Sequence, residues 1–129
     1  ELWKGIDAQY PPEVGLLAAV LDNVRRFVKA GGKIALGTDF AGAPGIEFNS
    51  GMPIVEMDLM KLADIPNVKI LVAATRGAAE YCGADDTIGT IAPGKRADLL
   101  IVDGDPLLRL EALQNISYVV HKGRMARSP

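Results

Sequence analysis

The feature of this sequence that most restricts its fold is a short apolar run, KIAL, at residues 33–36. The run has no polar alternation, and it ends directly in Gly37-Thr38-Asp39. Such a run is typical of a strand that is buried on both faces, as in a parallel sheet covered by helices. The sequence therefore predicts an α/β fold in which residues 33–36 form a buried strand.

Three other segments have the periodicity of helices. In residues 13–30, apolar side chains recur on one broad face with charged side chains opposite, and Gly31-Gly32 follows as a typical helix end. Apolar positions at helical spacing also predict helices at 53–63 and at 67–82. Helices therefore dominate the first two thirds of the chain.

The pattern changes after residue 84 to short strands and turns. Pro93-Gly94 is typical of the two central positions of a type II turn. The last two strands, joined by Lys122-Gly123, have the pattern of a hairpin. The elements predicted here are strands at 88–91, 97–102, 116–121 and 124–126 and a short helix at 107–113.

Composition excludes several classes of protein. The 129 residues include 14 Lys and Arg against 16 Asp and Glu, and the net charge of −2 is spread without blocks. This balance leaves no electrostatic footprint for nucleic acid or for anionic lipid. There is no long apolar span and no signal-peptide pattern, and the single cysteine, Cys82, cannot pair within the chain. We therefore expect no nucleic-acid partner, no membrane insertion and a cytoplasmic location.

The inventory of metal-binding residues is small. A catalytic zinc needs about three protein ligands, usually including histidine. This chain has one histidine, His121, and one cysteine, Cys82, with no pair of ligands at helical or hairpin spacing. We therefore expect that it cannot build such a site alone. Because the sequence begins at Glu1 and not at Met, we also expect a processed, proteolysed or truncated product that lacks an N-terminal region.

Asp39 is the strongest candidate for chemistry. It follows the predicted strand at 33–36 and opens a glycine-rich stretch, 40–51, that reads as a long loop. The carboxyl ends of parallel strands are where α/β folds collect catalytic and binding groups, and long loops in compact domains are often functional. The alternative is that Asp39 only forms an Asx turn or caps a local backbone donor. Thr38 could support Asp39 through a hydrogen bond or serve the backbone alone.

Several motifs, taken in order, resemble the C-terminal portion of metal-dependent amidohydrolases. They are GGKIALGTDFAG, AATRGAAEYCG, IGTIAPGKRADLLIVDGDPL and VVHKGR. The resemblance runs from Glu13 onward and is nearest to the imidazolonepropionase-like and prolidase-like branches. It implies a fold made of the last strand and helices of a (β/α)₈ barrel, residues 1–84, plus the C-terminal strands of a small β-sandwich domain, residues 85–129.

The resemblance also implies a site and a reaction. Asp39 corresponds to the aspartate of barrel strand eight, which contacts the metal and acts as general base on metal-bound water. The implied activity is hydrolysis of an amide or other C–N bond in a small-molecule or dipeptide-like substrate. The implied cofactor of the full-length enzyme is zinc or another divalent metal, which suits this chemistry because it lowers the pKa of bound water.

One departure from the family matters for activity. The His-x-His of strand one, the strand-four lysine or carboxylate, and the histidines of strands five and six would all lie upstream of Glu1. We therefore expect the isolated chain to be inactive and metal-free. Its expected partner is the missing N-terminal segment or another copy, giving an oligomer. The alternatives are a non-catalytic folded remnant or interaction module, and a small-molecule binding domain that uses the 40–51 loop.

Four other features have structural interpretations. We expect His121 to be an exposed or packing side chain, and Cys82 to be a small residue of the core. Lys95 and Asp98 match family positions, where turn geometry and packing are the simpler reasons for them. The glycines between residues 37 and 51 fit no phosphate-binding motif, because no Gly-Lys-Ser/Thr follows them.

Overall fold

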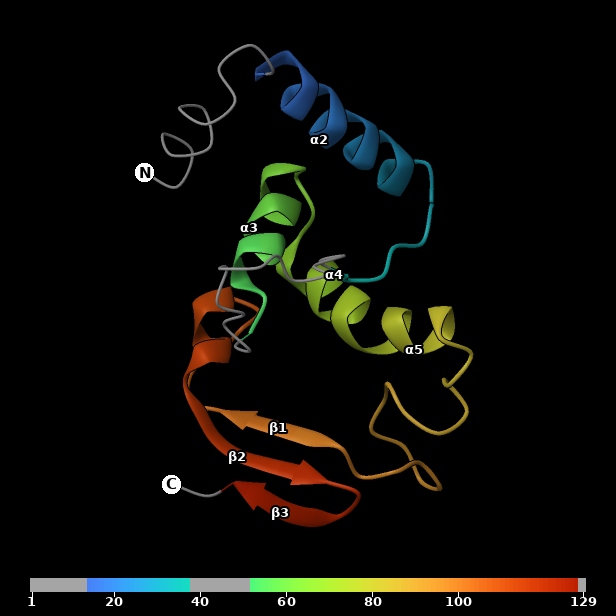
Figure 1. Ribbon diagram of the computed structural model, residues 1–129, viewed down its shortest axis with the longest axis vertical. Helices are drawn as coiled ribbons and strands as arrows, with labels where there is room; N and C mark the ends of the chain where they lie inside the picture. The colour runs from blue at the N-terminus through green and yellow to red at the C-terminus, as the bar shows by residue number, and fades with distance from the viewer. Residues whose placement is uncertain (1–13, 38–51, 128–129) are drawn as a thin grey trace, which may run out of the picture.

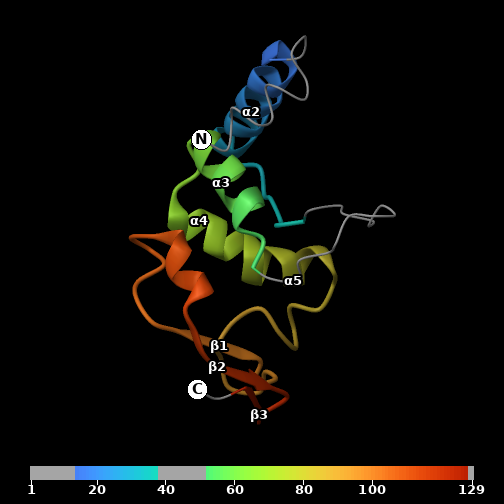
Figure 2. The same cartoon turned by 60° about the vertical axis from the view of Figure 1, so that its left-hand side comes forward.

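A computed structural model describes residues 14–37 and 52–127. Its helical part lies above a small antiparallel sheet (Figure 1). Figures 1 and 2 show two connections between these parts, a 3₁₀ helix on one side and the loop after the last α-helix on the other. The elements in chain order are α2 (Val14–Lys29), α3 (Ile54–Leu62), α4 (Asn67–Val72), the π-helical turn η2 (Ala73–Gly77), α5 (Ala78–Tyr81), β1 (Leu99–Val102), the 3₁₀ helix η3 (Leu110–Gln114), β2 (Ile116–His121) and β3 (Arg124–Arg127).

Helix α2 is the amphipathic segment predicted at 13–30. Leu21, Val24 and Val28 pack against the core, whereas Val20 and Phe27 are about half exposed, at 47% and 53%. The apolar face of α2 is therefore wider than its neighbours cover. The helix ends where the main-chain N–H groups of residues 31 and 32 turn back to the carbonyl groups of its last turns.

Helix α3 and the segment α4–η2–α5 confirm the predicted helices at 53–63 and 67–82. Asp64 adopts a left-handed conformation with φ of 58°, and this reverses the chain directly after α3. Pro66 then precedes α4, where a proline costs no helical hydrogen bond. The core lies between these elements and η3, and its largest fully buried side chains are Met57, Ile70 and Leu110.

The predicted strand at 33–36 is wrong for the chain as described, since these residues have no regular secondary structure. The described residues form one sheet, which is antiparallel and consists of β1, β2 and β3. No strand of it pairs with residues 33–36, and a strand without a partner leaves its main-chain groups without ladder hydrogen bonds. The buried parallel sheet is therefore absent from residues 14–37 and 52–127.

The terminal hairpin is confirmed. Strand β2 pairs with β1, where Leu100 lies opposite Val119, and with β3, where Val120 lies opposite Met125. The two-residue connection 122–123 has positive φ at both positions, 51° and 75°. This is the requirement of a type I′ turn, whose twist matches that of the strands it joins.

Three predictions after residue 84 need correction. Residues 88–91 form no strand and are part of an irregular loop. The Arg96 N–H closes this loop by donating a hydrogen bond to the Thr87 carbonyl oxygen, at 2.9 Å. The strand predicted at 97–102 begins at Leu99. The helix predicted at 107–113 is the 3₁₀ helix η3. Across the described ranges, no helix is long and apolar enough to span a membrane.

Candidate functional site

Asp39, the predicted catalytic and metal-binding residue, lies outside the described residues. The same holds for Thr38 and the loop at 40–51. The roles assigned to these residues therefore stay predictions. The structure describes the segment that leads to Asp39, which ends at Gly37.

This leading segment is fixed against the helix α4–η2–α5. The N–H of Leu36 donates to the carbonyl oxygen of Ala73 at 3.0 Å. Ile34 and Leu36 are partly buried against the core. The Lys33 ammonium lies 2.9 Å from Glu80 Oε2. Charged, apolar and main-chain contacts thus hold the segment at Lys33, Ile34 and Leu36.

Glu80 forms the ion pair that links the helix α4–η2–α5 to the segment leading to Asp39. Besides Lys33, it faces the guanidinium of Arg76, whose Nε lies 3.7 Å from Oε1. The hydrogen bond from Lys33 and its positive charge hold the pKa of Glu80 below its ordinary value, and Arg76 adds to the effect. Because the Lys33 side chain is 86% exposed, water weakens this ion pair.

No metal centre forms within residues 14–37 and 52–127, where no three His, Cys, Asp or Glu side chains cluster closely enough to hold an ion. His121 and Asp98 form one pair of potential ligands, with His121 Nδ1 3.2 Å from Asp98 Oδ1. Both oxygens of Asp98 are already hydrogen-bonded: Oδ1 accepts the N–H of Lys122 at 2.8 Å, and Oδ2 accepts Arg96 Nε at 2.6 Å. A positive guanidinium beside the carboxylate opposes a metal cation, so this pair does not fit a metal.

Asp98 instead joins the β2–β3 turn to the residues before β1. The hydrogen bond from the Lys122 N–H is the main reason that the pKa of Asp98 lies below its ordinary value, and the Arg96 guanidinium lowers it further. Lys95 has a related role, since its Nζ donates to the carbonyl oxygens of Asp85 at 2.5 Å and Ile88 at 3.4 Å. These contacts agree with the structural roles expected for Lys95 and Asp98.

The prediction that Cys82 is a small residue of the core is wrong. Cys82 is exposed, and Tyr81 is 85% exposed. The buried side chains are Ile70, Ala73 and Ala79. Cys82 is the C-cap residue of α5, so it lies at the end of the helix, beyond the buried Ala79.

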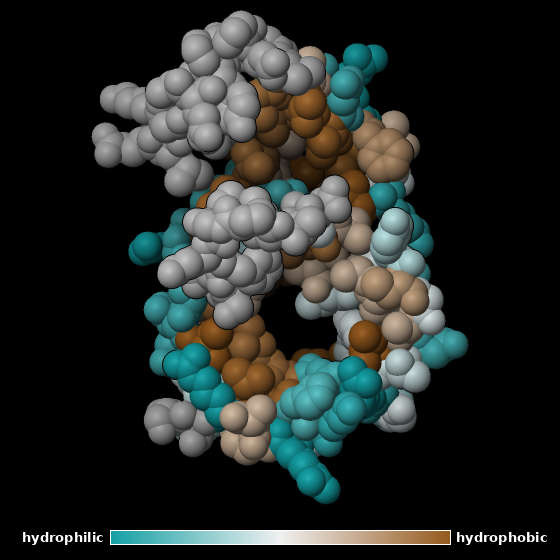
Figure 3. All heavy atoms as spheres, viewed as in Figure 1, coloured by the Kyte–Doolittle hydropathy of each residue, from teal (hydrophilic) through white to brown (hydrophobic). Residues whose placement is uncertain are grey.

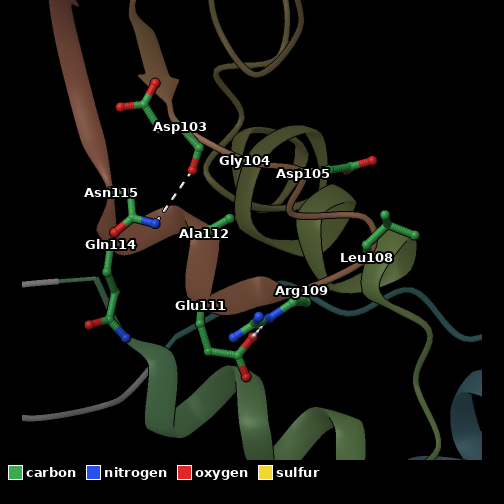
Figure 4. A pocket seen from close by; sticks show the side chains of 9 residues that line it. All are labelled: Asp103, Gly104, Asp105, Leu108, Arg109, Glu111, Ala112, Gln114 and Asn115. Carbon is green, nitrogen blue, oxygen red and sulfur yellow. Dashed lines mark hydrogen bonds and ion pairs between the residues drawn. The ribbon is translucent and has the colours of Figure 1, made fainter.

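A groove of about 500 Å³ lies beside η3 (Figure 4). None of its lining residues was predicted as a site residue from the sequence. Its carboxylates do not converge, since Figure 4 shows Asp103 and Asp105 pointing apart. Asp105 Oδ1 accepts the N–H of Leu107 at 2.8 Å in a local turn, and Glu111 faces Arg109. With few convergent polar groups, the groove lacks what a specific ligand site needs. Its lining residues are Asp103, Gly104, Asp105, Leu108, Arg109, Glu111, Ala112, Gln114 and Asn115.

Comparison with known proteins identifies the family. The amidohydrolase family model matches residues 4–126 of this chain. The chain therefore belongs to the amidohydrolase family, which confirms the resemblance seen in its motifs. The structural neighbours are amidohydrolase-fold proteins as well, consistent with an α/β fold.

Three similar proteins illustrate the relationship. A probable guanine deaminase of Schizosaccharomyces pombe is 35% identical over 109 residues, covering 72% of this chain and 19% of that protein. An imidazolonepropionase of Rubrobacter xylanophilus is 35% identical over 79 residues, covering 61% of this chain and 19% of that protein. The crystal structure of a Xaa-Pro dipeptidase with methionine bound in its active site superposes with a TM-score of 0.72 at 29% identity, covering 84% of this chain and 26% of that one. The chain thus spans about a fifth to a quarter of the proteins that it resembles.

Proposed function

We propose that this chain is the part of an amidohydrolase that contributes the aspartate of barrel strand eight, Asp39. In this proposal Asp39 contacts a divalent metal, zinc in the first instance, and accepts a proton from water during hydrolysis of an amide or other C–N bond. The single observation that carries the proposal is the family match over residues 4–126, which includes Asp39 and the motif around it. The relatives support the reaction class, since a deaminase and a dipeptidase are named for breaking C–N bonds.

The remaining metal ligands come, in this proposal, from residues outside the 129-residue sequence. The whole sequence holds one histidine and one cysteine, and the described residues bring no three ligands together. A catalytic zinc takes about three protein ligands. Asp39 therefore completes a site whose other ligands lie on an N-terminal amidohydrolase segment or on another copy. When bound there, the metal would lower the pKa of water toward neutrality.

The barrel and sandwich roles follow from the same proposal. Residues 33–36 become barrel strand eight once neighbouring strands give them partners, and the helices after them cover its outside. Strands β1 to β3 become the C-terminal share of the small β-sandwich. We further propose a cytoplasmic enzyme whose substrate is a small molecule or is dipeptide-like.

A second candidate is a folded module without catalysis. It is favoured by the core around Met57, Ile70 and Leu110, which the described residues complete among themselves. In this case the chain folds and associates, and Asp39 has only a local backbone role. The two candidates differ in what the substitution of Asp39 does to turnover.

The decisive variant is Asp39→Asn in an active protein that joins this chain to the segment completing the metal site. The amide has nearly the shape of the carboxylate but cannot accept the proton, so we expect turnover to be abolished while the thermal unfolding curve is unchanged. Asp86→Asn, at an exposed turn position, is the matched control and should keep wild-type activity. If Asp39→Asn kept more than about a tenth of the wild-type kcat, a difference of only ~1.4 kcal/mol in the barrier, the general-base role would be wrong.

A further inference from the structure

The 3₁₀ helix η3 is the one part of the described chain after residue 84 that enters the buried core. Its side chains Leu110 and Leu113 are 0% and 8% exposed. They belong to the same buried cluster as Met57 of α3 and Ile70 of α4. Among the described residues, neither this cluster nor the side chains packed against it include a residue of β1, β2 or β3, and Figure 3 shows the hollow between helices and sheet. The sheet therefore reaches the core through η3.

The sheet closes the base of the loop that carries η3. The Asp103 N–H donates to the Asn115 carbonyl oxygen at 2.8 Å, and Val102 lies opposite Ile116 in the register of β1 and β2. Only one residue, Asn115, separates η3 from β2. A displacement of η3 therefore displaces the start of β2, the central strand of the sheet.

Polar contacts hold the same loop to the helices. Asn67 Nδ2, at the start of α4, donates to the Leu107 carbonyl oxygen at 3.0 Å. The Lys61 ammonium of α3 lies 3.9 Å from Glu111 Oε1, and the two side chains are 41% and 47% exposed, so water weakens this ion pair. The burial of Leu110 is therefore the main attachment of the loop to the helical part.

The other end of the sheet is attached without apolar burial. The Gly123 N–H donates to the Ala97 carbonyl oxygen at 2.9 Å, and the Lys122 N–H donates to Asp98 Oδ1 at 2.8 Å. The connection that follows α5, residues 82–98, contributes no side chain to the core. Apolar coupling between sheet and helices therefore depends on η3.

We propose that η3 couples the sheet to the helical core, so that the two parts stabilise each other and unfold together. When either part opens, the loop loses one of its two attachments, and keeping it ordered then costs more conformational entropy per remaining contact. By linkage, chain that pairs with a sheet edge also stabilises α3 and α4. This inference goes beyond the proposed function and does not depend on the role of Asp39.

Hydrogen exchange, measured residue by residue in the 129-residue chain, tests the coupling from the side of η3. Leu110→Ala leaves a cavity at a fully buried site, and we expect it to speed exchange of the Ile70 amide and of the β2 amides by the same factor, about thirtyfold or more. Leu108→Ala is the matched control, since Leu108 is 78% exposed in the same loop, and it should change neither by more than about twofold. A faster Ile70 amide with unchanged β2 amides would overturn the proposal.

The reverse direction is tested in the sheet. Gly123 has φ of 75°, so Gly123→Ala strains the β2–β3 turn and should speed exchange in β2 by about fivefold or more. We expect the Ile70 amide, in the helical part, to speed by the same factor. Arg124→Ala, at the exposed neighbouring position, is the control and should change neither by more than about twofold. Faster exchange in β2 alone would contradict the coupling.

One criterion applies to every variant: the amides of α4 and β2 must change by the same factor. If Leu110→Ala does not fold, Leu110→Val, which removes a single carbon from the same buried site, is compared with Leu108→Ala instead. If Gly123→Ala leaves β2 unchanged, the η3 variants decide alone. Equal factors would support the coupling and unequal factors would overturn it, whatever Asp39→Asn does to turnover.

Discussion

Among single residues, Asp98 makes the densest set of polar contacts described for any carboxylate in residues 14–37 and 52–127. It accepts hydrogen bonds from Arg96 and from the Lys122 N–H, and it faces His121. The first two contacts favour its charged form, which lowers its pKa. Since Lys122 lies in the β2–β3 turn, the negative charge of Asp98 holds the hairpin to the residues before β1.

The pH dependence of stability should report this charge. A carboxylate whose pKa is lower in the folded state stabilises the protein above its unfolded-state pKa, near 3.8, and loses this contribution as the pH falls through the lower folded-state value. Asp98→Asn should therefore lower the urea midpoint of unfolding at about pH 7. The midpoints of wild type and variant should converge as the pH falls through the lowered folded-state pKa of Asp98. The control Asp86→Asn should show a much smaller difference from wild type at neutral pH, and equal midpoints for Asp98→Asn and wild type at neutral pH would contradict the account.

Single-residue roles could be predicted where local sequence decides them. The structural roles of Lys95 and Asp98 follow from their places in a turn motif. The exposure of Cys82 could not be predicted, because helical periodicity indicates which side chains share a face and not where along the helix the core ends. The role of Asp39 was inferred from its motif and stays a prediction.

Among the elements, α4 is central to the core. Ile70 is fully buried, whereas Val68, two residues earlier in the same helix, is 53% exposed. The pair offers a comparison within one element, since both side chains are β-branched and both positions are helical.

The cost of truncating these two side chains should differ sharply. Ile70→Ala removes atoms from a closely packed site and should lower the free energy of unfolding by about 2–5 kcal/mol. Val68→Ala removes atoms that are largely in water and should change it by at most about 0.5 kcal/mol. Denaturant unfolding followed by circular dichroism measures both values. A similar loss in the two variants would mean that the core does not lie where the structure places it.

The helices and the terminal hairpin could be predicted because their signals are local. Periodicity marks the helices, and Lys122-Gly123 marks the turn between β2 and β3. Residues 33–36 were predicted as a strand because they have a strand's composition, but pairing depends on neighbours that the described residues do not supply. The same residues instead contact η2.

At the scale of the molecule, the described residues leave apolar and main-chain groups uncovered. Figure 3 shows the surface hollowed between the helical part and the sheet, with hydrophobic residues on its margin. In the described sheet β1 and β3 are edge strands, each paired on one side by β2. Leu100, Ile101 and Met125 on these strands are 41%, 45% and 59% exposed. Open edges and exposed apolar side chains favour association with further chain.

Association should therefore be measurable. We expect the purified 129-residue chain to form an oligomer, or to bind a segment that supplies the missing strands, because either covers the sheet edges and the exposed part of α2. Static light scattering at micromolar concentration gives the mass directly. A monomer that unfolds cooperatively without a partner would show that the chain covers its own edges, and would favour the non-catalytic module.

The family could be predicted from the sequence because its motifs are spread in order along the chain, and the family match confirms it. The substrate could not be predicted, because specificity in barrel enzymes depends on the loops after all eight strands. This chain contains one such loop by its resemblance, residues 40–51, which lies outside the described residues.

The central claim is that this chain contributes one ligand to a metal site and does not build the site itself. Zinc content by elemental analysis, after purification and removal of loosely held ions, tests it most directly. We expect far less than one zinc per chain for the 129 residues alone, and tightly held zinc that depends on Asp39 once the chain is joined to the segment with the other ligands. About one tightly held zinc per isolated chain, lost in Asp39→Asn, would contradict the claim.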